Sequence, residues 1–363
     1  MYNSAIAVLE KLESFGYKAY IVGGYPRDLY LKRSSSDIDI CTDATPKEIM
    51  NLFDEIITTN FEYGSITISY EKVKFEITTF RKEAKYRGFR KPSKIEYVQS
   101  LEEDIKRRDF TINTLCIDKN GNEVDLLNAK SDLDNKIIRM VGSPKEKLRE
   151  DALRILRAVR FATVLDFELE PVLKAYIKKY SSLVKKLSKE RQKEELDIIF
   201  SSSNKEKGIK LLNDLRLSDN LDIPLLKKIK ITPSMIVTWS ELDVLNKFPF
   251  NSSERETIIK INELRTKNLL DKRVLYEYGL YICTLASEIK NVDKKILNEI
   301  YASTPIHSKN DIALKPNEIC EVLDKEPGGF LKIVLNDLEE KILLGSVKNT
   351  KSDLTKYITN NYK

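Results

Sequence analysis

The spacing of hydrophobic positions changes about a third of the way along the chain. From Lys18 to Val124 the apolar residues form short β-branched runs, separated by turn signals such as GG, YG and KNGNE. Strands are predicted at KAYIV, SDIDICT, GSITISY, VKFEITTF and TINTLCI. Between the second and third of these, TPKEIMNLF predicts a helix with Thr45 as its N-cap and Pro46 at its first position. This part of the chain is therefore expected to be an α+β head built on a mixed or antiparallel sheet.

After about Ser143 the apolar residues recur every three or four positions, which is typical of amphipathic helices. Examples are the segments EDALRILRAVRFATVL, ELEPVLKAYIKKYSSLVKKL and KEELDIIF. The sequence therefore predicts an all-α region of consecutive domains, in an elongated arrangement, behind the head. The expected boundaries are 1–138 for the head, 139–200 for a neck, 201–300 for a body and 301–363 for a tail.

The composition fits a soluble globular protein, with 41% hydrophobic and 33% charged residues. No apolar run approaches the roughly 18 residues that a membrane span requires. Glu10 and Glu13 make the first segment an amphipathic helix and not a signal peptide. The four cysteines have no CxxC spacing, which argues against a disulfide framework and a zinc site. We therefore expect a cytoplasmic protein with no membrane partner.

The net charge of +6 is modest for 363 residues, but basic residues are concentrated at 178–193, KKYSSLVKKLSKERQK. Such a stretch suits a nucleic-acid backbone, whose binding is mainly electrostatic. A solvated helical face explains the same residues equally well.

The sequence SDIDI places Asp37 and Asp39 two positions apart on a predicted strand, so both carboxylates face the same side. Two such anions repel each other unless a cation lies between them, and hard oxygen ligands suit Mg²⁺ together with substrate phosphates. Glu76, on the predicted strand VKFEITTF, could add a third carboxylate. The alternatives are a solvated strand edge for the aspartates and a cross-strand salt bridge for Glu76.

Gly23 and Gly24 follow the predicted strand KAYIV, and Arg27 comes three residues after them. A glycine turn between a strand and a helix lets backbone N–H groups approach phosphate oxygens closely. Arg27 could then clamp a triphosphate. An ordinary turn, with Arg27 paired to Asp28, is the alternative interpretation.

The segment RRDFTIN contains two adjacent cations, an acid and an amide. Arg107, Arg108, Asp109 and Asn113 could contact the ribose hydroxyls and phosphates of a nucleotide. A surface charge cluster would show the same pattern.

In EDALRILRAVRF the residues Arg154, Arg157 and Arg160 are spaced to lie along one face of a helix, with Asp151 one turn earlier. Stacked like charges are unfavourable, so this face favours a polyanion. Asp151 is an acceptor and Arg154 a donor, so together they could pair with cytosine or adenine. Uracil and guanine would present a carbonyl to the carboxylate and be rejected. A solvated helix with internal salt bridges is the alternative.

The motifs GGYPRD, DID, RRDFTIN, EDALRILRAVRF and ERQKEEL, in this order and at these spacings, carry a resemblance to a known family. They resemble the class II tRNA nucleotidyltransferases and the related bacterial poly(A) polymerases, which belong to the DNA polymerase β-like superfamily. The match covers about the first 200 residues, and the segment from His307 resembles the tail of the bacterial CCA-adding branch. The alternatives to a CCA-adding enzyme are an enzyme that adds only A, a poly(A) polymerase, or an inactive RNA-binding protein of the same fold.

The resemblance implies addition of C, C and A to tRNA from CTP and ATP without a nucleic-acid template, and no protein partner is predicted. It implies two Mg²⁺ ions held by Asp37 and Asp39, with Glu76 as a further catalytic residue. The nucleotide-binding residues it implies are Gly23, Gly24, Arg27, Arg108, Asp109, Asn113, Asp151, Arg154, Arg157 and Arg160. Glu150, Arg191 and Glu194 are expected to brace the helix that selects the base, and the helical region to hold the acceptor arm.

A flexible loop between Glu76 and RRD is expected by the same resemblance, with the pattern Tyr-x-Asp-x-Arg-Arg-Pro. This chain has YRGFRKP, so Tyr86, Arg90 and Pro92 match, whereas Gly88 replaces the acid and Lys91 an arginine. The full length of the loop argues against an enzyme that adds only two C residues.

Overall fold

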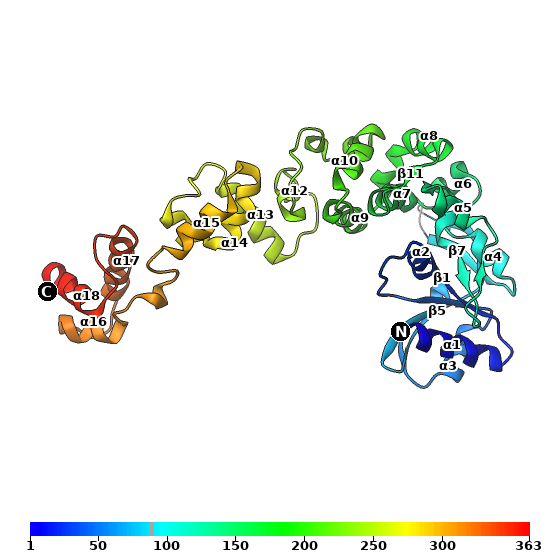
Figure 1. The fold of residues 1–363 in the computed structure, drawn as a ribbon, viewed down its shortest axis with the longest axis horizontal. Helices are drawn as coiled ribbons and strands as arrows, with labels where there is room; N and C mark the ends of the chain where they lie inside the picture. The colour runs from blue at the N-terminus through cyan, green and yellow to red at the C-terminus, as the bar shows by residue number, and fades with distance from the viewer. Residues whose placement is uncertain (88–90) are drawn as a thin grey trace. The chain divides into compact units, whose positions relative to one another are not determined.

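The computed structural model describes residues 1–87 and 91–363, and it describes side chains outside residues 84–94. Contacts divide this described chain into two compact units, residues 1–228 and 229–363. The first unit contains the α+β head and a group of helices, and the second is helical (Figure 1). The α+β head followed by a helical region is thereby confirmed, whereas the finer division into neck, body and tail stays a prediction.

Seven strands of the described chain form one mixed sheet in the order β3-β4-β5-β2-β1-β8-β9. Neighbouring strands are antiparallel except for β2 and β5, which pair in parallel with Asp39 opposite Glu76. Of the predicted strand TINTLCI only the last two residues pair, because Thr111–Asn113 forms a 3-10 turn. The strands are β1 Ala19–Val22, β2 Asp39–Thr42, β3 Ile56–Asn60, β4 Ser65–Tyr70, β5 Val73–Thr79, β8 Cys116–Ile117 and β9 Glu123–Val124.

The two faces of this sheet carry separate hydrophobic clusters. Ile21 and Ile40 point into the larger cluster, which the helices α1 (Tyr2–Ser14) and α3 (Pro46–Leu52) cover (Figure 1). Val22 and Cys41, one residue further along each strand, point into the other cluster beside α4 (Leu101–Lys106). Asp39, the first residue of β2, is exposed, and the three residues after it are buried. Two further helices complete the head, α2 (Gly24–Tyr30) and α5 (Ala129–Asp134).

The two ends of the predicted flexible loop are paired strands of a β-hairpin. The strands β6 (Arg81–Arg87) and β7 (Lys91–Tyr97) pair antiparallel, with Arg81 opposite Tyr97. The predicted loop residues Gly88 and Arg90 lie outside the described residues, as does the side chain of Tyr86.

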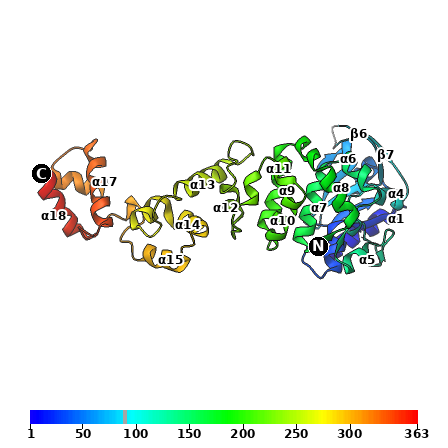
Figure 2. The same cartoon turned by 90° about the horizontal axis from the view of Figure 1, so that it is seen from above.

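The rest of the first unit is helical, and α7, α9 and α10 pack together (Figure 2). The segment EDALRILRAVRFATVL was predicted to be one helix, but it contains a break. Asp151 has extended φ and ψ of −136° and 107° and ends α6, and α7 begins at Leu153. The elements are α6 Pro144–Glu150, α7 Leu153–Val164, α8 Pro171–Lys179, α9 Lys189–Ser201, α10 Lys205–Asp214 and α11 Leu217–Asn220, with a two-stranded pair of β10 Ile137–Ile138 and β11 Glu168–Leu169.

The second unit contains several small hydrophobic cores. One core gathers residues from Leu264 to Leu297, and another gathers residues from Ile306 to Ile358. None of the described helices has the length and apolar character needed to cross a membrane. The helices are α12 Met235–Ser240, α13 Ser252–Glu263, α14 Lys272–Lys290, α15 Lys294–Ala302, α16 Pro316–Leu323, α17 Phe330–Leu343 and α18 Lys351–Tyr362.

Candidate active site

A cleft of about 500 Å³ in the first unit brings most of the predicted site residues together. We call it the first cleft. Glu76, Asp37, Glu150 and Glu194 do not line it. The predicted residues that do are Gly23, Gly24, Arg27, Asp39, Arg107, Arg108, Asp109, Asn113, Asp151, Arg154, Arg157, Arg160 and Arg191.

Gly23 connects β1 to α2 directly beside Asp39. Its φ of +87° belongs to a region that residues with a side chain rarely adopt. A Cβ atom at this position would lie 3.3 Å from Oδ2 of Asp39. The glycine therefore serves two needs at once, the turn out of β1 and the space for the Asp39 carboxylate.

The carboxylates around β2 are close enough to influence one another. Asp37 and Asp39 are both exposed, and Ile38 between them is buried, so the predicted common face is retained although Asp37 precedes the strand. Partial loss of water in the cleft and the neighbouring Glu76 raise the pKa of Asp39 to about 6, and Asp37 contributes in the same direction. Ser65 donates a hydrogen bond to Glu76. Among the described residues no three acidic, histidine or cysteine side chains are grouped as a metal site, and the catalytic role of Glu76 stays a prediction.

Arg27 links the glycine turn to RRDFTIN. Its Nε and Nη2 atoms each donate to a different oxygen of Asp28 at 3.0 Å, as the alternative interpretation expected. Its Nη1 atom also donates to Oδ1 of Asn113 at 2.7 Å, and the guanidinium still lines the first cleft. The Asp28 pair therefore orients Arg27 and does not withdraw it from the site.

Asp109 connects the head to α7 by accepting hydrogen bonds from both. Its carboxylate accepts from Asn113 Nδ2 at 3.0 Å and from Arg157 Nε at 2.7 Å. Burial by itself would raise the pKa of Asp109, but Arg157 and the hydrogen bonds from Asn113 and Phe110 outweigh it and lower the pKa to about 2. The carboxylate is therefore charged and fixed at neutral pH.

Asp151 and Arg154 both face the cleft, but not from one helix as predicted. Oδ1 of Asp151 accepts from the Leu153 backbone N–H at 2.9 Å, between the end of α6 and the start of α7, and Asp151 lines the cleft. Burial raises the pKa of Asp151. Arg154 is 6% exposed and donates to Glu150 Oε2 at 3.0 Å and to the Arg107 carbonyl at 3.2 Å. The planar guanidinium is thereby held in one orientation.

Phe161 was not singled out from the sequence, although it lines the cleft. The guanidinium carbons of Arg27, Arg157 and Arg160 lie 5.2, 5.3 and 4.3 Å from the centre of its ring. The ring face attracts all three cations, which reduces their mutual repulsion. Phe161 is spaced as a core residue of an amphipathic helix, and nothing in that pattern distinguishes it from its neighbours.

Of the three residues predicted to hold α7 in place, Glu150 and Arg191 lie at the site and Glu194 does not. Glu150 does hold Arg154, and Arg191 on α9 lines the cleft. Glu194, however, is exposed, and the neighbouring Glu195 forms the ion pair with Arg160, at 2.6 Å between Oε2 and Nε. The bracing acid is therefore Glu195, because the inner side of α9 includes position 195 and not position 194.

A second cleft, of about 590 Å³, lies on the other side of Asp39. It shares Asp39, Arg107, Arg108 and Arg191 with the first cleft, and Glu76 lines only the second. Its remaining lining residues are Val22, Ile40, Asn60, Tyr63, Ser65, Thr78 and Arg81. Asp39 is thus accessible from two adjoining spaces.

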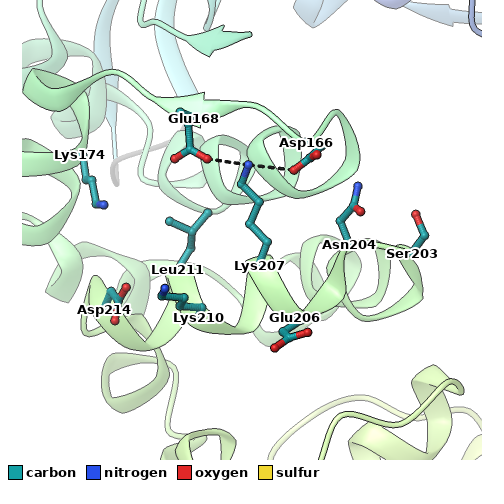
Figure 3. A pocket seen from close by; sticks show the side chains of 10 residues that line it. All are labelled: Asp166, Glu168, Lys174, Ser203, Asn204, Glu206, Lys207, Lys210, Leu211 and Asp214. Carbon is teal, nitrogen blue, oxygen red and sulfur yellow. Dashed lines mark hydrogen bonds and ion pairs between the residues drawn. The ribbon is translucent and has the colours of Figure 1, made fainter.

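A separate cavity of about 530 Å³ lies between β11 and α10 and contains none of the predicted site residues (Figure 3). Lys207 lies between Asp166 and Glu168, with its Nζ atom 3.0 and 2.8 Å from their oxygens (Figure 3). The lining contains four acidic residues and three lysines, so its charge does not favour binding of a polyanion such as RNA.

Comparison with known proteins decides the family. Residues 19–139 match the model of a poly(A) polymerase head domain, 166–229 that of an RNA- and SrmB-binding site of polymerase A, and 241–358 that of tRNA nucleotidyltransferase domain 2. The CCA-adding enzyme of Streptococcus suis is 31% identical over 98% of this chain and 96% of its own length. The CCA-adding enzyme of Streptococcus gordonii is 33% identical over 98% of this chain and 97% of its own length.

The chain belongs to the CCA-adding enzyme family. It is a nucleotidyltransferase, and the resemblance that the motifs indicated is confirmed. The crystal structure of the Bacillus stearothermophilus CCA-adding enzyme in complex with CTP is 26% identical, with a TM-score of 0.86 over 99% of this chain and 97% of that one. The Thermotoga maritima CCA-adding enzyme complexed with tRNA is 16% identical, with a TM-score of 0.70 over 99% of this chain and 95% of that one. This likeness shows the common fold.

Proposed function

We propose that this chain adds C, C and A to the 3′ end of tRNA, taking the nucleotides from CTP and ATP and using no nucleic-acid template. The observation that carries the proposal is the first cleft, in which Asp39 shares one cavity with an oriented acceptor, Asp151, and an oriented donor, Arg154. The relatives are CCA-adding enzymes, and similar structures are complexes with CTP and with tRNA.

The base is selected at the Asp151 end of the first cleft. The carboxylate of Asp151 accepts from the exocyclic amine of cytosine or adenine, and Arg154 donates to a ring nitrogen. Because Glu150 and the Arg107 carbonyl hold the guanidinium, little side-chain entropy is lost when the base binds. Protein side chains thereby replace a template strand.

The reaction takes place at the junction of the two clefts. We place the triphosphate near Gly23, Arg27 and Arg108 and the RNA 3′ end in the second cleft, so that the two substrates meet at Asp39. The 3′-hydroxyl oxygen bonds to the α-phosphorus and its proton passes to water. The bond between the α-phosphorus and the oxygen that bridges to the β-phosphate breaks, and pyrophosphate leaves with that oxygen. The chain contributes mostly positioning and electrostatic stabilisation.

Asp37 and Asp39 fit the two Mg²⁺ ions that this chemistry uses. Both are exposed, hard oxygen donors. Partial loss of water and, after it, the neighbouring Glu76 and Asp37 raise the pKa of Asp39, and a cation bound between the carboxylates would offset their mutual repulsion. When bound, the ions would stabilise the attacking hydroxyl and the leaving pyrophosphate.

The test offers three tRNA transcripts, which end at the discriminator base, after two added C residues, or with complete CCA. Each is incubated with CTP, ATP or both, and products are resolved on a sequencing gel. We expect CTP to add two residues to the first, ATP one residue to the second, and no extension of the third. Repeated addition of A by ATP alone would identify a poly(A) polymerase instead, and no extension of any transcript would indicate an inactive RNA-binding protein.

Asp39→Ala is the control for the assignment of the chemical step. It should abolish addition of both C and A and leave tRNA binding nearly unchanged, because the RNA is held mainly by helical parts of the chain. Wild-type turnover with Mg²⁺ would show that Asp39 is not a metal ligand.

A further inference from the structure

Asp104 on α4 is a fully buried carboxylate that none of the motifs described above includes. Its Oδ1 atom accepts from Arg107 Nε at 2.7 Å and from the backbone N–H of Arg81 at 3.2 Å. Its Oδ2 atom accepts from Arg108 Nη2 at 3.2 Å. One buried anion therefore holds two adjacent arginines and the first residue of the β6–β7 hairpin.

The two arginines that Asp104 holds line both clefts. Arg107 is connected further, because its carbonyl accepts the hydrogen bond from Arg154. In the part of the chain that the structure describes, Asp104 is the acceptor for the Arg108 guanidinium, whose buried Nε has no hydrogen-bond partner. The position of Arg108 beside Asp39 thus depends on Asp104.

The charge of Asp104 is essential to this arrangement. Burial by itself would raise its pKa, but Arg107 and Arg108 outweigh burial and lower it, so the carboxylate stays ionised. Without that charge two adjacent cations would face each other in a site with little water. Both would then move toward other anions, and Arg107 already lies 3.5 Å from Glu83.

We propose that Asp104 is a positioning residue of the active site, which sets Arg108 toward the triphosphate and, through Arg107, Arg154 toward the base. It also joins both to the start of the β6–β7 hairpin through the backbone N–H of Arg81. The inference rests on the proposed function, since it names residues that orient the groups binding CTP and ATP.

The first test compares Asp104→Asn with Asp132→Asn. Asp132 is also a buried carboxylate, 7% exposed, that accepts from Arg139 Nε at 3.1 Å and from the Thr111 hydroxyl, but it lines neither cleft. Both variants should lower the melting temperature. Only Asp104→Asn should raise the Kd of CTP, measured by calorimetry, and its KM, by roughly tenfold to a hundredfold, as when a residue that orients a ligating group is removed. It should also change the kcat/KM ratio of CTP to UTP.

A second variant separates positioning from folding. Asp104→Asn removes the anion that Arg107 and Arg108 share, whereas D104N/R107Q removes one positive and one negative charge together. This double variant should recover much of the lost melting temperature and keep the raised Kd of CTP, because Arg108 is still unheld. A CTP affinity and CTP-to-UTP ratio equal to those of Asp132→Asn, in both variants, would overturn the inference. Wild-type protein that adds nothing to tRNA would overturn the proposed function, which is a distinguishable result.

Discussion

Replacing Gly23 by alanine tests whether the turn after β1 sets the position of the catalytic carboxylate. The substitution has two effects of different kind. It forces a residue with a side chain to a φ of +87°, which costs about 1–3 kcal/mol of folding free energy. It also places a methyl carbon 3.3 Å from Oδ2 of Asp39, so the carboxylate must shift by a few tenths of an ångström.

Gly16 provides a matched control in the same unit. Its φ is +89°, but a Cβ atom there would have no neighbour within 4 Å. Gly16→Ala should therefore also strain a backbone with positive φ, but leave the site intact. The difference between the two variants isolates the effect of displacing Asp39.

The free energy of unfolding, measured by urea denaturation, should fall in both variants. The two variants should differ in kcat for CTP addition to a tRNA that lacks CCA. Since a misplacement of about 1 Å costs about 10²-fold in rate, the smaller shift forced by Gly23→Ala should lower kcat by roughly tenfold relative to Gly16→Ala. Equal kcat values would refute the idea that Gly23 makes space for the carboxylate.

Three further predictions follow from the first cleft and the hairpin. Asp151→Ala should let UTP compete better with CTP, by about 1–3 kcal/mol in the ratio of kcat/KM, and an unchanged ratio would make Asp151 merely structural. Replacing residues 84–91 by a short Gly-Ser linker should leave addition of two C residues largely intact and stop the product there, whereas Gly88→Asp should add A at least as fast as the wild type. If the linker variant completes CCA at the wild-type rate on a gel, the hairpin has no role in A addition. Because the pKa of Asp109 is lowered to about 2, its ion pair with Arg157 stabilises the fold above about pH 4 and loses this effect as the pH falls toward 2. The difference in unfolding free energy between wild type and Asp109→Asn should therefore shrink from pH 5 to pH 3, and a difference that grows would contradict the assignment.

Much of the local structure could be predicted from the sequence because its causes are local. β-branched runs mark β1, β4 and β5, and Thr45 caps α3 as its position before Pro46 indicated. The glycine turn at Gly23 and the three-residue spacing of the arginines on α7 were likewise visible. These features depend on a residue and its near neighbours along the chain, which a sequence displays directly.

The errors lie where neighbouring residues compete for the backbone or for one side of a helix. The helix predicted through Asp151 is broken at the extended backbone of this residue, whose carboxylate accepts a hydrogen bond from the Leu153 backbone N–H. Likewise Glu195 and not Glu194 pairs with Arg160, since only one of two adjacent positions faces α7. Periodicity alone predicts a face only to within about one residue.

The sequence by itself determined which chemical groups the site contains, and the tertiary structure decided which of them act together. Arg27 contacts Asn113 across 86 residues, and Asp109 contacts Arg157 across 48. The parallel pairing of β2 with β5 sets Glu76 beside Asp39, on the side of the second cleft. Asp104 had no motif of its own, yet its carboxylate pairs with two arginines that line both clefts. A buried charge requires a partner, but the identity of that partner follows from how distant elements pack, and no local pattern in the sequence records it.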